Sequence, residues 1–192
     1  AIFFDPGYRA KPLVFCGTGG LLPLYIKAGN ETRDAVKKHT RAGDLIVMAG
    51  GRVGKDGIHG ATFSSESLNE GSPMSAVQIG DPFTQKRLLD FVIDARDAGL
   101  ITGITDNGAG GLSSSVGEMA TITCGATIHL DRVPTKYPGL ADWEIVVSES
   151  QERMTISTND FEAMKKLADK HNVEVSNIGE FNNKGYFEVQ NN

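Results

Sequence analysis

Residues 44–65 read DLIVMAGGRVGKDGIHGATFSS, a short apolar run that leads directly into a loop rich in glycine. An apolar run of this length, bounded by glycine, is typical of a central strand that is buried on both faces of a sheet. Clustered glycines indicate tight turns or a backbone that approaches other groups closely. The stretch therefore predicts a buried strand followed by a constrained loop.

The segments after this loop alternate between helical and strand patterns. Asp81 and Pro82 suit the start of a helix, and Gly99 suits its end. The apolar stripe of this helix consists of Leu88, Phe91, Val92 and Ala95, widened by Leu89 and Ile93. Further helices are expected at 112–121 and 160–171, and further strands at 100–105, 126–130, 153–157, 173–179 and 185–189. Residues 143–147 fit either a helix or a strand, because short apolar runs do not separate the two.

The resulting fold class is α/β with α+β character, a mixed β-sheet flanked by helices. The last two strands are expected to form an antiparallel hairpin around the turn at 182–185. Residues 1–43 read differently, with a short strand at 13–15 and a polar stretch at 27–41 without an apolar stripe. We interpret 1–43 as the remnant of a preceding domain with its linker, and 44–192 as the domain proper.

The composition is that of an ordinary globular protein, with 192 residues, 40% apolar and 22% charged side chains and a net charge of −5. No basic patch is dense enough to predict a nucleic-acid partner. No apolar run approaches the ~20 residues of a membrane span, so no membrane partner is expected. The two cysteines lie far apart without metal-ligand spacing, which indicates reduced thiols and a cytoplasmic protein. The chain starts without Met, so we expect an excised fragment.

The loop at 50–65 is a candidate anion site, because glycine frees backbone amides and Arg52, His59 and Ser65 add donors. It does not have the spacing of a Walker A loop. The alternative is a structural glycine turn, which the pattern alone slightly favours.

Two single residues stand at predicted element ends. Gln78 precedes a helix start, where its amide could contact a ligand, although a surface glutamine fits equally simply. Asp106 follows a predicted strand and precedes a helix, a position that suits a Mg²⁺ ligand. An aspartate that caps the next helix explains Asp106 equally well.

Residues 148–154 read SESQERM and lie between two apolar runs. Consecutive hydrogen-bonding side chains in this setting indicate a buried or ligand-facing polar network rather than an exposed turn. The sequence offers no nucleophile–base pair and no zinc-type spacing.

Four strings, GGRVGKDGIHGATFSS, VQIGDPF, ITDNGAGGLSSSVGEMA and SESQERM, occur in this order between residues 50 and 154. Together they resemble the phosphoribosylformylglycinamidine synthase family, and within it a C-terminal domain of the aminoimidazole ribonucleotide synthetase type. Their length and order make the resemblance specific. It implies an ATP-dependent ligase of purine biosynthesis, which amidates formylglycinamide ribonucleotide with ammonia derived from glutamine.

The resemblance also implies roles for single residues. Gln78, Glu149, Ser150 and Gln151 would contact the substrate, and Asp106 would hold Mg²⁺. ATP would be bound mainly by an N-terminal partner domain, and ammonia would come from a glutaminase domain or subunit. The chain alone is therefore expected to be inactive. Two alternatives stay open, namely a related ligase such as aminoimidazole ribonucleotide synthetase, and a non-catalytic structural half or docking module. The string SESQERM argues against the former, and the joint presence of Gln78, Asp106 and Glu149 against the latter.

Overall fold

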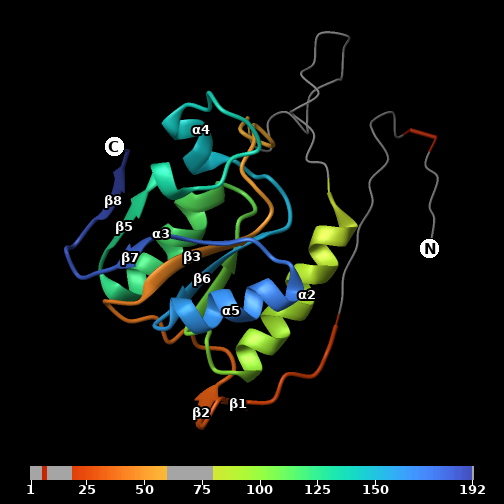
Figure 1. The fold of residues 1–192 in the computed structure, drawn as a ribbon, viewed down its shortest axis with the longest axis vertical. Helices are drawn as coiled ribbons and strands as arrows, with labels where there is room; N and C mark the ends of the chain where they lie inside the picture. Colours follow the sequence, from red (N-terminus) through yellow and green to blue (C-terminus); the bar gives the residue numbers. More distant parts are fainter. Residues whose placement is uncertain (1–5, 8–18, 60–79, 192) are drawn as a thin grey trace.

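The computed structural model describes residues 6–7, 19–59 and 80–191. Its main feature is a six-stranded sheet with helices on both faces, in the strand order β4-β6-β3-β7-β5-β8 (Figure 1). The strands are β3 (Leu45–Gly50), β4 (Gly103–Asp106), β5 (Ala126–His129), β6 (Arg153–Thr158), β7 (Val175–Phe181) and β8 (Phe187–Gln190). This mixed sheet confirms the predicted fold class. The strand expected at 13–15 lies outside the described residues.

Strand β3 is the centre of the sheet, as its apolar run predicts. It pairs antiparallel with β6 on one side and with β7 on the other. Its side chains alternate between the two faces: Ile46 and Met48 belong to one core cluster, and Val47 and Ala49 to the other. All four are buried, which explains why the strand is apolar at every position.

Helices α3 (Gly111–Thr123) and α4 (Asp142–Val147) contribute to the first cluster, together with the 3-10 turn η2 (Leu130–Arg132). Helix α3 inserts Leu112, Val116 and Met119, which are fully buried. Each such side chain stabilises the fold by about 1.5–3 kcal/mol. The segment at 143–147, which the sequence left open between helix and strand, belongs to α4 and is helical.

Helices α2 (Pro82–Asp97) and α5 (Phe161–His171) contact each other and cover the second face (Figure 1). The Asp81 side chain accepts from the Phe83 amide at 3.0 Å, so Asp81 caps α2 as predicted. Leu88, Phe91 and Ala95 are buried in the predicted stripe. The expected widening of the stripe is wrong, because Leu89 and Ile93 are 50% and 38% exposed.

The predicted hairpin of the last two strands is wrong. Strand β5 lies between β7 and β8, and it pairs antiparallel with β7 but parallel with β8. The turn at 182–185 is held by the end of α3, because Asn182 N donates to Gly125 O at 2.9 Å and Gly185 N to Cys124 O at 2.7 Å. These bonds fix the turn across the end of β5, so that the chain continues into β8 on the edge of β5 opposite to β7.

The polar stretch at 27–41, which the sequence analysis placed in the linker, contains part of a two-stranded hairpin, β1 (Tyr25–Ala28) and β2 (Glu31–Asp34). Gly29 N donates to Asp97 O at 3.2 Å and Arg33 Nη1 to Ile101 O at 3.2 Å, so the hairpin rests on the end of α2. No helix within 19–59 or 80–191 combines the length and apolar character needed to span a bilayer.

Candidate functional site

The glycine loop that follows β3 meets the turn that precedes β6. At Gly50, φ is +104°, and a Cβ there would lie 2.1 Å from the Glu152 carbonyl oxygen. Gly51 N donates to the same oxygen at 2.9 Å. Glu152 itself has a φ of +55°, which is uncommon for a residue other than glycine. The absence of a side chain at Gly50 thus allows the two backbones to touch, and the sequence segments at 50–57 and 148–153 form one site.

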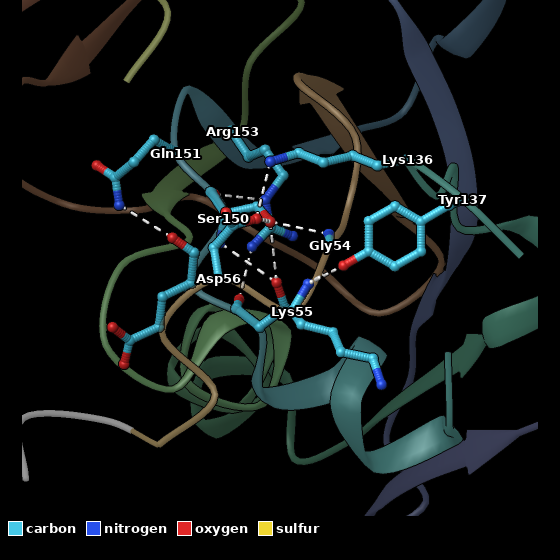
Figure 2. A network of polar contacts seen from close by, with 10 residues as sticks. Gly54, Lys55, Asp56, Lys136, Tyr137, Ser150, Gln151 and Arg153 are labelled. Carbon is cyan, nitrogen blue, oxygen red and sulfur yellow. Dashed lines mark hydrogen bonds and ion pairs between the residues drawn. The ribbon is translucent and has the colours of Figure 1, made fainter. Parts of the chain in front are cut away.

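A carboxylate of the glycine loop, Asp56, links the two segments (Figure 2). Its Oδ2 accepts hydrogen bonds from Ser150 Oγ and from Lys136 Nζ, the latter at 2.8 Å. Its carbonyl oxygen accepts from Glu149 N at 2.8 Å. Burial by itself raises the pKa of Asp56, but the hydrogen bonds from Lys136 and Ser150 outweigh it and hold that pKa below its ordinary value. Asp56 is therefore ionised at neutral pH.

The serines of the turn are enclosed, since Ser148 and Ser150 have no exposed surface. Ser150 Oγ accepts from Gly54 N at 2.8 Å and lies 3.1 Å from Ser148 Oγ. The predicted buried polar network at 148–154 is confirmed by these contacts, and an exposed polar turn is excluded.

Arg153 also supports the turn (Figure 2). Its Nε donates to Ser150 O at 2.7 Å and its Nη2 to Ser148 O at 2.6 Å. The residue is only 3% exposed, and burial lowers its pKa to about 10, an effect that the charge of Asp56 partly offsets. The guanidinium is thus charged at neutral pH while it holds two backbone carbonyls.

Glu149 reaches in another direction, toward the start of α3. Its Oε1 accepts from Gly110 N at 3.2 Å, next to the positive end of that helix. Asp106 begins the same loop, and its Oδ1 accepts from Gly108 N at 2.9 Å. Asp106 ends β4 and is exposed, whereas Glu149 is 9% exposed. The structure thus brings these two predicted residues to opposite ends of one loop.

A pocket of about 350 Å³ lies beside the turn and the first residues of α2. Its lining comprises Gly50, Gly51, Arg52, Asp81, Thr84, Arg87, Lys136, Gln151, Glu152, Asn172, Val173 and Glu174. Gln151 faces this pocket while its Nε2 donates to Glu149 O at 2.9 Å. Arg52, a predicted anion contact, forms a two-pronged bond to Glu174 at 2.8 and 3.1 Å, which raises the pKa of Arg52. The charge of Arg52 is therefore already engaged.

The other predicted contacts lie at or beyond the end of the described loop. His59 is exposed and is the last described residue before position 80. Gln78 and Ser65 lie outside the described residues. Within the described part of the chain, no group of three or more His, Cys, Asp or Glu side chains could hold a metal ion. Asp106 is thus a single carboxylate without a surrounding cluster there.

Sequence reasoning missed Asp56, Lys136 and Tyr137. The Tyr137 hydroxyl accepts from Lys55 N at 2.9 Å, and the Lys55 ammonium lies 3.0 Å from Glu144 Oε1. Lys136 and Tyr137 come from an irregular segment whose sequence has no periodic pattern. The one available signal was Asp56, a carboxylate within the glycine loop.

The family described as "AIR synthase related protein, C-terminal domain" matches residues 41–191. That range contains the whole six-stranded sheet, its helices and the site. The chain therefore belongs to this family.

The relatives specify which member the chain is similar to. Phosphoribosylformylglycinamidine synthase subunit PurL of Picrophilus torridus is 40% identical over 194 residues, which cover 98% of this chain and 25% of the relative. The same subunit of Thermotoga maritima is 44% identical over 138 residues, which cover 70% of this chain and 23% of the relative. The chain thus spans about a quarter of the length of these relatives.

Solved structures agree with the sequence relatives. PurL of T. maritima complexed with FGAR matches with a TM-score of 0.72 and 38% identity, over 80% of this chain and 26% of that chain. The same protein complexed with ATP matches with a TM-score of 0.67 and 34% identity, and PurLQS from T. maritima with 0.65 and 32%; both cover 80% of this chain and 24% of that chain.

Proposed function

We propose that this chain is part of a phosphoribosylformylglycinamidine synthase, an ATP-dependent ligase that converts the amide of formylglycinamide ribonucleotide to an amidine with ammonia from glutamine. The proposal is supported by the PurL relatives and by the structures of T. maritima PurL complexed with FGAR and with ATP. Loss of the amide oxygen requires its activation by a phosphoryl group, which ATP supplies. This reaction depends on positioning and charge more than on a nucleophilic side chain.

The observation that carries the proposal is the enclosed turn at 148–153 beside the pocket. Fixed hydrogen-bonding groups at the edge of a pocket are what recognition of a polar ribonucleotide requires. We assign substrate contacts to the turn around Ser150, through Glu149 and Gln151, and to Gln78. His59 and Ser65 are proposed as further anion contacts, whereas Arg52 would first have to leave Glu174.

Asp106 is proposed as a ligand of Mg²⁺. Mg²⁺ prefers oxygen ligands and usually keeps several waters, so one exposed carboxylate at a strand end fits its needs. One oxygen of Asp106 is already fixed by Gly108 N, which orients the side chain. When bound, Mg²⁺ would neutralise charge on the phosphate groups of ATP.

The remaining parts of the enzyme would lie elsewhere in the longer protein and its partners. We propose an N-terminal domain that holds most of the ATP site, with a boundary near residue 43, and a glutaminase domain or subunit. PurLQS from T. maritima supports partner subunits for the related enzyme. Following the expectation from the cysteines, the proposed compartment is the cytoplasm.

Substitution in the longer protein tests this function. Gln78→Ala and Glu149→Ala are each expected to weaken binding of formylglycinamide ribonucleotide by at least tenfold, because a lost hydrogen bond to a charged or buried group costs about 1.5–3 kcal/mol. Isothermal titration with the substrate measures the affinity. Asp90→Asn on α2 is a control, because the Lys86–Asp90 pair is solvent-exposed. Unchanged affinity in both alanine variants would favour the non-catalytic half of the enzyme instead.

The second expectation concerns the chain by itself. Incubated with ATP, Mg²⁺, formylglycinamide ribonucleotide and ammonia, the isolated 192-residue chain should produce no amidine, since most of the proposed ATP contacts are supplied by another domain. Release of phosphate that depends on the substrate is the readout, with the longer protein as positive control. Turnover by the chain alone would show that it contains a complete active site.

A further inference from the structure

We infer that Asp56 and Arg153 are positioning residues that hold the turn at 148–151, and that the Ser150 hydroxyl belongs to this support and does not contact the substrate. The inference rests on the proposed function in one respect, namely that Glu149 and Gln151 bind the substrate. It revises the set of substrate contacts by separating the side chains that bind from those that hold them in place.

The Ser150 hydroxyl has no capacity left for a ligand. A hydroxyl offers one donor and two acceptor sites. The ionised Asp56 can only accept, so the Ser150 hydroxyl donates its hydrogen bond to Asp56 Oδ2. Gly54 N donates to Ser150 Oγ at 2.8 Å, and Ser148 Oγ, 3.1 Å away, must therefore donate to the second acceptor site. With all three sites filled and no exposed surface, this side chain cannot meet a substrate unless the turn opens.

Asp56 fixes two consecutive residues of the turn. Its carboxylate holds the side chain of Ser150, and its carbonyl oxygen holds the backbone amide of Glu149 at 2.8 Å. Lys136, 2.8 Å from the same carboxylate, keeps Asp56 ionised and in place. The glycine at position 54 is part of this arrangement, because a Cβ there would lie 2.9 Å from Asp56 Oδ2. Asp56 therefore sets where the turn lies relative to the glycine loop.

Arg153 fixes the main chain of the same turn. Its two bonds end on the carbonyls of Ser148 and Ser150, which flank Glu149 on either side. A planar guanidinium can hold two acceptors at fixed angles, which a lysine ammonium on a flexible stem cannot. The peptide unit before Glu149 and the one after Ser150 are thereby fixed, and they restrict the direction of the Glu149 side chain toward Gly110 N.

Binding geometry is sensitive to such support, because displacement of a contact by about 1 Å can cost up to a hundredfold in activity. In the longer protein, assayed with ammonia as nitrogen donor, Asp56→Asn and Arg153→Lys should each raise the KM for formylglycinamide ribonucleotide by about tenfold. Their kcat should change less than their KM. Asp90→Asn, which alters an exposed Lys–Asp pair on α2, should leave both constants unchanged.

The KM separates positioning from a purely structural role. A variant that only lowers the folded fraction loses kcat in proportion and keeps its KM, and that result for both variants would overturn the inference. Glu149→Ala, measured in parallel, distinguishes a failure of the positioning role from a failure of substrate binding by the turn. If Glu149→Ala raises KM but Asp56→Asn and Arg153→Lys do not, positioning is wrong and the proposed function stands. If Glu149→Ala also leaves KM unchanged, the substrate-binding role proposed for the turn fails as well.

A double-mutant cycle tests the role of Ser150. Ser150→Ala removes the group that Asp56 holds, so Asp56→Asn should add little to its effect on KM, and the two changes should be clearly non-additive. A direct contact between Ser150 and the substrate predicts instead that the two fold-changes multiply. Multiplying effects would therefore overturn the assignment of Ser150 to the supporting network.

Discussion

The glycine loop carries an ion pair at each end, and the two pairs differ in the burial of their acidic side chains and in their further contacts. At one end Arg52 and Glu174 pair while 57% and 40% of their side chains are exposed. At the other end Asp56, 14% exposed, pairs with Lys136 and also holds Ser150 and the backbone of Glu149. An exposed pair gains little, because water screens it and two long side chains must be ordered. The comparison teaches that an ion pair stabilises this site only where its charge also holds buried polar groups, as Asp56 holds Ser150 and the Glu149 amide.

Arg153 is the most buried charge of this network, and its removal should have the largest effect on the stability of the fold. Arg153→Met would leave the carbonyls of Ser148 and Ser150 buried without donors, and each loss costs about 1–3 kcal/mol. We expect the free energy of unfolding to fall by about 2–4 kcal/mol, read from urea denaturation at pH 7. An unchanged midpoint would mean that the turn does not depend on the guanidinium.

Asp56→Asn should have the next largest effect, about 1–2 kcal/mol at pH 7, and this effect should depend on pH. The folded-state pKa of Asp56 lies below its unfolded value. The carboxylate therefore stabilises the fold fully above the unfolded pKa, and this stabilisation disappears as pH falls through the folded pKa. Melting temperatures of the wild type and the variant should differ by a constant amount above the ordinary pKa of an aspartate and converge as pH falls below it. A difference that stays constant with pH would show that the charge of Asp56 is not what matters.

Arg52→Met at the exposed end should have the smallest effect. Loss of the pair with Glu174 is expected to shift the melting temperature by no more than about 2 °C, and less in high salt. Thermal unfolding at low and at high NaCl concentration measures this. A larger shift than that of Asp56→Asn would reverse the comparison between the two ends of the loop.

Periodicity accounts for the elements of the fold that were predicted correctly. The helix at α2 could be placed from Asp81, Pro82 and its stripe, and β3 from an apolar run that both faces bury. The pairing of β8 could not be predicted, because neighbouring strands usually pair and the bonds from the 182–185 turn to Cys124 and Gly125 are long-range contacts. Leu89 and Ile93 fit the stripe by spacing, but an apolar residue at its margin can face solvent.

The site was predictable only where its polar residues are consecutive. The sequence of residues 148–154 predicted a buried polar network, because consecutive hydrogen-bonding side chains lie between two apolar runs. Lys136 and Tyr137 reach the glycine loop through the fold alone, by way of the bridge between Val53 and Thr135. The roles of Gln78, Glu149, Gln151 and Asp106 in binding stay predictions.

The central position of β3 has a consequence for how the chain acquires its structure. Both neighbours of this strand, β6 and β7, come from the C-terminal third of the described chain, after position 150. Contacts between residues so distant in sequence slow folding, because the intervening chain must be ordered first. During synthesis β3 leaves the ribosome long before either partner exists. The second hydrogen-bonding edge of β3 is therefore completed only after residue 181 has emerged, when β7 can pair with it.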